Sequence, residues 1–290
     1  MKKILVPTDF SPSAHKALHF AVEIAKEAKA QIILLHACTD LFATNTMSDH
    51  TLYPDYNQTR VNEAKEQISL LKKSIEDTEK VSVNTQVYEG SVEDTILRAS
   101  EDTDADLIIM GTLGDTGLNE KIFGSVTAGI IGKTNIPVLT VPLLSEWAVP
   151  KKILLAVNDF GQRTEVVNSV FDLAKMFKAS VHIAFFTELY SENEDVTPHQ
   201  VEDILVYEEK LQTRHPETVI RAFHLKGHLF QDTIEDYLEK QNVDVVAMVT
   251  HKRGFLESVF HASMTKKMSY YSNIPLLAVP EKAKQGAATI

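Results

Sequence analysis

Short apolar runs alternate with longer amphipathic stretches along the first half of the chain. Apolar runs of about four to eight residues are typical of strands buried on both faces, whereas apolar residues three or four apart are typical of helices that cover a sheet. The runs predict strands at 3–6, 32–37, 81–87, 106–110 and 138–141. The wider spacing predicts helices that begin at 12, near 61, at 90 and at 125, and Ser11 and Pro12 are the expected N-cap and first residue of the first helix. Strands that alternate with helices predict an α/β fold with a doubly wound parallel sheet.

The second half of the chain repeats this order, so the sequence carries an internal duplication. The segment Lys151–Phe160 resembles Lys2–Phe10 with one extra residue, and Asn273–Pro280 aligns without a gap with Asn135–Pro142. We expect two domains, at residues 1–143 and 150–281, joined by a linker at 143–150. Each domain is expected to hold a five-stranded parallel sheet.

Composition and charge narrow the classes of protein and partner. A net charge of −11 argues against general binding to nucleic acid or to an anionic membrane surface, since both favour basic patches. The single cysteine, Cys38, excludes an internal disulfide framework and is expected to be a buried thiol. No apolar run approaches the length of a membrane span. We therefore expect a cytoplasmic protein.

A glycine-rich segment follows the predicted fourth strand. Gly111 and Gly114 come directly after it, and Gly124 with Ser125 lies where the next helix begins. Glycine lets a backbone approach a ligand closely, and free N–H groups at a helix N-terminus attract anions. The spacing is neither a Walker A motif nor a dinucleotide fingerprint. From these residues alone, a glycine turn with a serine helix cap is an equally good interpretation.

The spacing of these glycines, followed by Ile136–Pro142, resembles the ATP-binding signature of the universal stress protein family. The opening Lys3–Ser11 resembles the first strand and turn of the same family. The resemblance covers both halves, as in the tandem form of the family. It implies a Rossmann-like fold of the adenine nucleotide alpha hydrolase type with strand order 3-2-1-4-5. In that order the ligand crevice lies at the carboxyl ends of strands one and four.

The resemblance also implies how the two domains are arranged. Family members commonly pair through the fifth strand, and the two fifth strands of this chain are expected to pair internally around a pseudo-two-fold axis. An exposed apolar edge would otherwise favour aggregation. Cysteines at Thr140 and Ala278 should then cross-link. A further homodimer of whole chains is compatible with the sequence.

The resemblance assigns roles to residues of the first domain. Asp9 would bind the ribose or adenine side of a nucleotide, although from this residue alone a loop carboxylate near a helix N-terminus is the better interpretation. The backbone of Thr8 and Ala37 would line the adenine pocket, and Gly111 and Gly114 would admit the phosphates. The phosphates would be bound by N–H groups and hydroxyls of the next helix, at Gly124, Ser125, Val126 and Thr127. The implied cofactor is ATP, ADP or AMP, with or without Mg²⁺.

Two departures from the family pattern limit this assignment. Asp115 follows the second glycine, and a carboxylate there would repel phosphates unless Mg²⁺ bridges them or the side chain turns outward. In the second domain Val249, Lys252 and Ala262 replace the glycines, while Asp159 is retained. We therefore expect the first domain to bind an adenine nucleotide and the second not to bind one.

The sequence favours a nucleotide-binding regulatory or stress-response protein with slow or no hydrolysis, because the motifs supply no general base or cationic clamp. No catalytic residue is assigned, and a weak ATPase is the most enzymatic interpretation. A non-nucleotide-binding interaction module is the main alternative. Related hydrolases and ligases carry a Ser-Gly-Gly loop after strand one, and this chain does not. No metal site is predicted, since His224 and His228 straddle a strand end.

Overall fold

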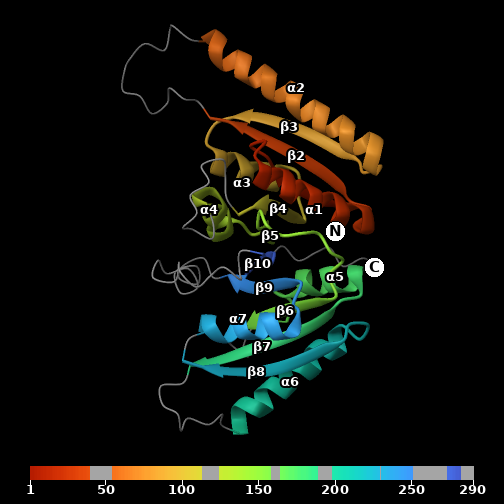
Figure 1. The fold of residues 1–290 in the computed structure, drawn as a ribbon, viewed down its shortest axis with the longest axis vertical. Coiled ribbons are helices and arrows are strands. Elements are labelled where there is room, and N and C mark those ends of the chain that lie inside the picture. Colours follow the sequence, from red (N-terminus) through yellow and green to blue (C-terminus); the bar gives the residue numbers. More distant parts are fainter. Residues whose placement is uncertain are drawn as a thin grey trace.

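The computed structural model describes residues 1–39, 54–112, 124–157, 164–188, 198–228, 230–250 and 273–281. Within these ranges the strands form one ten-stranded sheet in the order β3-β2-β1-β4-β5-β10-β9-β6-β7-β8 (Figure 1). The first half contributes β1 Lys3–Pro7, α1 Pro12–Ala28, β2 Gln31–Cys38, α2 Pro54–Glu79, β3 Val83–Glu89, α3 Val92–Asp102, β4 Leu107–Gly111, α4 Ser125–Lys133 and β5 Val138–Val141. The second contributes β6 Lys152–Val157, α5 Asn168–Phe177, β7 Ser180–Glu188, α6 Pro198–Arg214, β8 Ile220–Gly227, α7 Phe230–Gln241, β9 Val245–Thr250 and β10 Leu276–Pro280.

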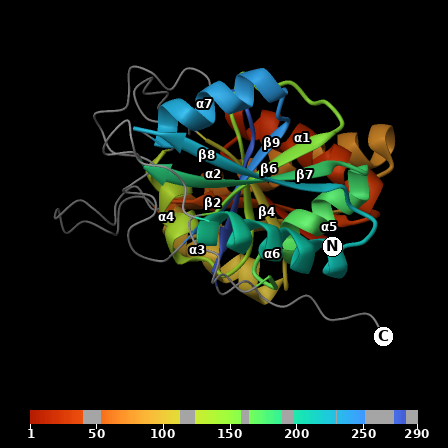
Figure 2. The ribbon, with the colours of Figure 1, turned by 90° about the horizontal axis from the view of Figure 1, so that it is seen from below.

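The two halves meet at their fifth strands, which confirms the predicted order and pairing. Each half has the order 3-2-1-4-5 with parallel neighbours, and β5 pairs with β10 in the antiparallel sense. Figure 2 looks along the row of strands and shows them turned progressively relative to one another, as in a twisted sheet.

The register between β5 and β10 differs from the proposed cross-link. Leu139 lies opposite Leu277, whereas Thr140 lies opposite Leu276 and Ala278 opposite Val138. The pair Thr140 and Ala278 is therefore diagonal, and cysteines at Leu139 and Leu277 are the better choice. β10 has no polar residue to fix its register against β5, so the sequence pattern could not distinguish these pairings.

The first helix of each half ends in the same way but begins differently. Ser11 caps α1, its Oγ accepting a hydrogen bond from Ala14 N at 3.2 Å, and Pro12 occupies the first turn as predicted. Lys29 and Lys178 end α1 and α5 in the left-handed conformation. α1 has 17 residues, whereas α5, which begins at Asn168, has 10. In the second half, the apolar spacing predicts Val167 as a residue inside the first helix, whereas in the structure it is the N-cap of α5.

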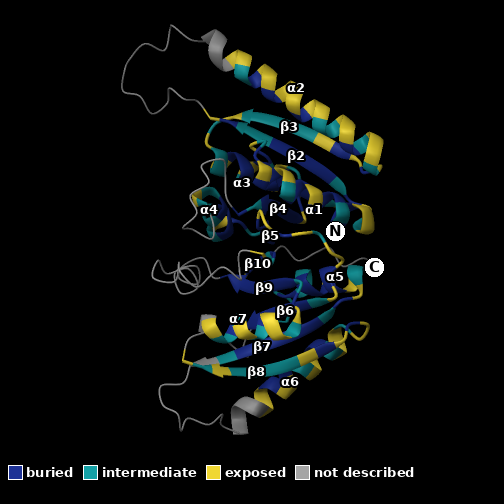
Figure 3. Ribbon diagram, viewed as in Figure 1, coloured by how far each residue is buried: buried dark blue, intermediate teal, exposed yellow. Residues whose placement is uncertain are grey.

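Apolar side chains bury both faces of the sheet. One cluster runs through both halves on the face covered by α1, α2, α5 and α6, and it includes Leu139 and Leu277. On the other face, α3 and α4 cover a cluster around Ile108, and α7 covers a separate one around Val246. The strands at the centre are accordingly almost entirely buried (Figure 3). Cys38 is buried as expected, and burial raises the pKa of its thiol.

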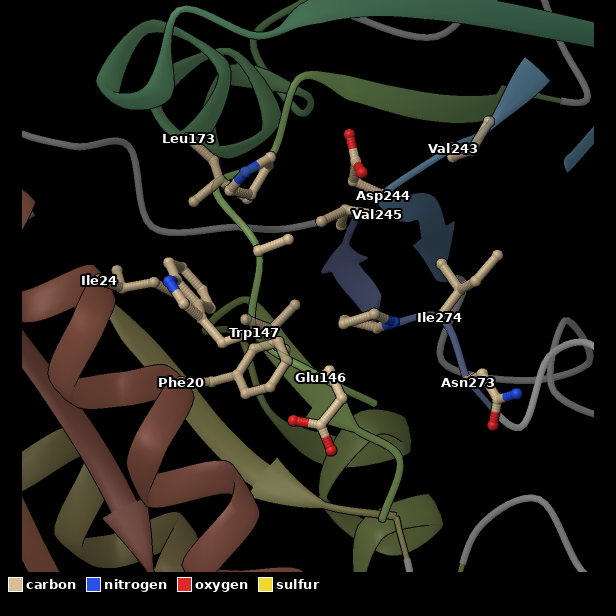
Figure 4. Close-up of a pocket in the computed structure, with 14 residues that line it drawn as sticks. Phe20, Ile24, Glu146, Trp147, Leu173, Val243, Asp244, Val245, Asn273 and Ile274 are labelled. Carbon is tan, nitrogen blue, oxygen red and sulfur yellow. The ribbon is translucent and has the colours of Figure 1, made fainter. Parts of the chain in front are cut away.

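The linker between the halves is anchored at two residues. Ser145 is buried, and its Oγ donates to Asn273 O at 2.6 Å. Trp147 lies between Phe20 of α1 and Phe177 of α5, with ring centroids 5.1 and 5.8 Å away. Beside Trp147 a cavity of about 180 Å³ remains, bordered by Ile24 and Leu173 (Figure 4). The exact domain boundaries, 1–143 and 150–281, stay a prediction.

None of the helices in the described ranges is long and apolar enough to cross a membrane.

A buried histidine of the second half predicts acid sensitivity. His182 is 6% exposed, its Nδ1 lies 2.8 Å from Tyr237 Oη, and burial with the nearby Lys152 and Arg221 lowers its pKa to about 4. Unfolding returns this pKa to about 6.5, so the unfolded chain binds more protons between these values. The stability contributed by neutral His182 is therefore complete above about pH 6.5 and decreases toward pH 4, by up to about 3 kcal/mol.

Urea unfolding at pH 7.5 and pH 5 measures this loss. The double variant His182→Ile, Tyr237→Phe places an isoleucine at the position that Ile33 occupies in the first half and leaves no orphaned hydroxyl. It should show a smaller loss of stability on acidification than the unmodified chain. An equal loss in both proteins would assign the acid sensitivity to other groups.

Candidate functional site

A cavity of about 240 Å³ opens at the carboxyl ends of β1, β2 and β4, beside the first turn of α4. In the order 3-2-1-4-5, β2 and β3 are added on one side of β1, and β4 and β5 on the other. The connections from the parallel strands β1 and β4 therefore leave in opposite directions and leave a crevice at this point. Except for Gly114, the residues singled out from the sequence all line it: Thr8, Asp9, Ala37, Gly111, Gly124, Ser125, Val126 and Thr127. The structure therefore brings together segments that are about a hundred residues apart.

The turn after β1 is held in a defined conformation. Thr8 N donates to Leu35 O at 2.8 Å, and Thr8 Oγ1 accepts from Phe10 N at 3.0 Å. Asp9 Oδ1 accepts from Ser11 N at 3.0 Å, and the Asp9 side chain is otherwise exposed at the mouth of the cavity. Because a carboxylate has a second oxygen, Asp9 can still accept hydrogen bonds from a ligand.

The first turn of α4 corrects two sequence-based expectations. Gly124, not Ser125, is the N-cap, and Ser125 is the first helical residue with an exposed side chain. The Gly124 N–H donates to Thr112 O at 2.7 Å, so it is not available to an anion. The N–H groups of Ser125 and Val126 lie in the first turn, where a helix has no internal acceptors for them.

Thr127 has an internal hydrogen bond as well. Its Oγ1 donates to Gly111 O at 3.0 Å and ties the first turn of α4 to the end of β4. The hydroxyl of Thr127 therefore positions the helix N-terminus, and because its proton is used, only the backbone N–H of Thr127 can donate to a phosphate.

Gly111 is required by packing against α1. A Cβ at Gly111 would lie 2.2 Å from Ser13 Oγ and 2.9 Å from Ser13 O. The backbone at Gly111 thus lies close to the first turn of α1, a contact that the sequence pattern did not indicate. In the second half Val249 is 1% exposed at the matching position.

Some predicted features lie outside the described residues. These are Gly114, Asp115, Asp159, Lys252 and Ala262.

The walls of the cavity and one histidine beside it were not predicted from the sequence. Apolar side chains of β2, α3 and β4 line the cavity: Leu35, Val92, Ile96 and Met110. The alternation along β2 could have identified Leu35, because it points to the same face as Ala37. His36 stacks on Phe10 with ring centroids 4.7 Å apart, and its Nδ1 lies 2.8 Å from Thr8 O. No motif indicated His36, since its neighbours are defined only by the fold.

Comparison with known proteins gives a consistent result. The model of the universal stress protein family matches residues 1–142 and 150–280. A universal stress protein of Methanocaldococcus jannaschii is 36% identical over 154 residues, which covers 48% of this chain and 94% of that protein. One from Bacillus subtilis is 30% identical over 144 residues, covering 48% of this chain and 97% of that protein.

Among solved structures, a universal stress protein from Archaeoglobus fulgidus is similar along the whole chain. The TM-score is 0.72 at 18% identity, with 98% of both chains covered. At this identity the similarity concerns the fold.

Proposed function

The chain belongs to the universal stress protein family, and from that premise and the geometry of the crevice we propose that its first half binds an adenine nucleotide. The observation that carries the proposal is the convergence of Asp9, Ala37 and the first turn of α4 on one cavity. Each supplies a different part of a nucleotide site.

The first turn of α4 suits a phosphate group. The N–H groups of Ser125 and Val126, the Ser125 hydroxyl and the helix dipole all favour an anion there. Gly124 brings the backbone close without a side chain of its own. Anions bind in this way at many helix N-termini, and no cationic side chain is needed.

The rest of the cavity suits a nucleoside. Leu35, Val92, Ile96 and Met110 form apolar walls for the faces of a base. The free oxygen of Asp9 can accept from ribose hydroxyls. Such a site has mostly apolar walls and a few placed polar groups, as small-molecule sites generally do.

The chemistry supports binding more than turnover. Asp9 is the only ionisable side chain among the described residues that line the cavity, and it already accepts from Ser11 N. No group of three or more His, Cys, Asp or Glu residues that could hold a metal occurs within the described ranges. If Mg²⁺ accompanies the nucleotide, phosphate oxygens would supply ligands, and among the described residues that line the cavity Asp9 is the one carboxylate that could add another. We propose a regulatory, nucleotide-binding role with slow or no hydrolysis.

Calorimetric titration with ATP, ADP, AMP and adenosine tests this proposal on two variants of one residue. Ser125→Pro removes both the N–H and the hydroxyl, yet proline is favourable at the first helical position. Gly124 already has φ −63° and ψ 160°, the extended conformation that a residue before proline requires. Ser125→Ala removes the hydroxyl alone.

We expect Ser125→Pro to weaken phosphate-bearing nucleotides by about tenfold to a hundredfold, since hydrogen bonds to charged groups contribute about 1.5–3 kcal/mol. Ser125→Ala should have a smaller effect, and adenosine should bind both variants as it binds the unmodified chain. Equal ATP affinity in Ser125→Pro and the unmodified chain would contradict the phosphate assignment. A chain that binds none of these compounds would contradict the proposal as a whole.

A further inference from the structure

We propose that His36 is a positioning residue that keeps the backbone N–H of Ala37 available to the base of the nucleotide. It does so by donating its own ring N–H to the carbonyl that the Ala37 N–H would otherwise bind. The identity of the base rests on the proposed function, but the effect of His36 on Ala37 is measurable without any ligand.

The hydrogen-bond pattern of a parallel sheet identifies the displaced partner. In such a sheet, a residue that donates to residue n of the next strand accepts from residue n+2 of that strand. Thr8 N donates to Leu35 O at 2.8 Å. The regular donor to Thr8 O is therefore the N–H of Ala37.

His36 takes that place with its side chain. Its Nδ1 lies 2.8 Å from Thr8 O, and because a carbonyl can only accept, Nδ1 carries the proton. None of the backbone hydrogen bonds found between described residues joins Ala37 N to Thr8 O. The Thr8 carbonyl thus accepts from the ring, and no backbone hydrogen bond found between described residues uses the Ala37 N–H on this side.

The Ala37 backbone faces the cavity. Backbone groups along β2 point alternately to its two neighbours, and Ile32 N and Cys38 O bond on the β3 side, to Ser82 O and Gly90 N. Ala37 lies an odd number of positions from Ile32 and from Cys38. Its N–H and C=O therefore point to the opposite side, toward β1. There the chain has turned away after Thr8, and Ala37 lines the cavity.

Phe10 holds the imidazole in this position. The two rings are stacked at 4.7 Å with an interplanar angle of 30°. Phe10 itself has φ 62°, a left-handed conformation that is unfavourable for a bulky residue and persists only when its surroundings compensate. Here the compensation comes from the stack, from the bond of Phe10 N to Thr8 Oγ1 at 3.0 Å, and from contact with the apolar residues of α2.

This arrangement gives His36 a consequence for specificity. One residue that offers both N–H and C=O matches a base edge with an acceptor beside a donor, as adenine has at N1 and N6. Hypoxanthine presents a donor at N1 and an acceptor at C6, the reverse order. A site whose N–H and C=O match the acceptor and donor of adenine would leave both of these backbone groups unpaired against hypoxanthine.

Two substitutions separate the ring of His36 from its hydrogen bond. His36→Phe keeps an aromatic ring to stack on Phe10 but has no donor, and phenylalanine is already present at the matching position of β7, Phe185. His36→Asn keeps an amide donor near the place of Nδ1 but loses the ring. Thermal unfolding of both variants checks that the fold is retained.

The first measurement is hydrogen exchange of the Ala37 amide by nuclear magnetic resonance, without ligand. We expect rapid exchange in the unmodified chain and in His36→Asn. In His36→Phe the Ala37 N–H should bind Thr8 O and exchange at least about tenfold more slowly, as one added hydrogen bond allows. An Ala37 amide that is already protected in the unmodified chain, or that exchanges equally in all three proteins, would overturn the proposal.

The second measurement is the affinity for AMP and for inosine monophosphate. The unmodified chain and His36→Asn should prefer AMP, and His36→Phe should lose about tenfold in AMP affinity and most of this preference. An unchanged preference in His36→Phe would overturn the specificity role. If exchange behaves as expected and neither nucleotide binds the unmodified chain, the proposed function fails while the role of His36 on Ala37 stands.

Discussion

Truncating either leucine on the pseudo-two-fold axis is expected to destabilise the whole chain, not one half of it. Leu139 and Leu277 face each other across β5 and β10, and each is 2% exposed. Both belong to the cluster that runs through the two halves. Leu139→Ala and Leu277→Ala should each cost about 2–5 kcal/mol, the usual range for a buried leucine. Urea unfolding should show this as a shift of one common transition.

A double-mutant cycle tests whether these two side chains act together. Because they are direct neighbours, the double variant should differ from the sum of the single ones by about 0.5–3 kcal/mol. Ile32 serves as the matched control, because it is buried in the same cluster but lies on β2, several strands from β10. Leu277→Ala combined with Ile32→Ala should be additive. Additivity for Leu139 with Leu277 as well would mean that the two halves are energetically independent at this seam.

Gly111→Ala is expected to destabilise the first half by about 1–3 kcal/mol, the usual cost of overpacking. The added Cβ would lie 2.9 Å from Ser13 O, and a backbone atom in the first turn of α1 cannot move away as a flexible side chain can. The strain falls on the turn that carries Asp9. We therefore expect weaker nucleotide binding together with the loss of stability.

Gly132→Ala in α4 is the matched control. A Cβ there meets nothing within 4 Å, so the same substitution should be neutral or stabilising through the helix propensity of alanine. Differential scanning calorimetry compares the two variants. If Gly111→Ala is as stable as Gly132→Ala, the contact with Ser13 is not the reason for glycine at this position.

The features that follow from local pattern and duplication were predictable from the sequence. Apolar runs located the strands, the repeat located the second half, and the order of strands followed from the family resemblance. The start of α1 was also predictable, because Ser11-Pro12 is a recognisable cap.

The features that depend on tertiary geometry were not predictable. The register of β5 against β10 needed the actual pairing, since shifting an apolar strand by two residues leaves its pattern unchanged. The use of the Gly124 N–H by Thr112 O, and the contact of Gly111 with Ser13, join segments that no motif relates. For the same reason the contacts of His36 with Phe10 and with Thr8 O could not be predicted from the sequence.

The position of Trp147 has a consequence for how the two halves could diverge. In a dimer of identical chains every substitution occurs twice, and a side chain near the axis must fit beside its own copy. Trp147 has no such copy, because the linker that carries it joins the halves only once, and it fits between Phe20 and Phe177 rather than between two equal residues. Covalent fusion thereby releases each half from the requirement of symmetry. One half can keep Gly111 while the other carries Val249 at the matching position, and the strands of both halves still form one sheet.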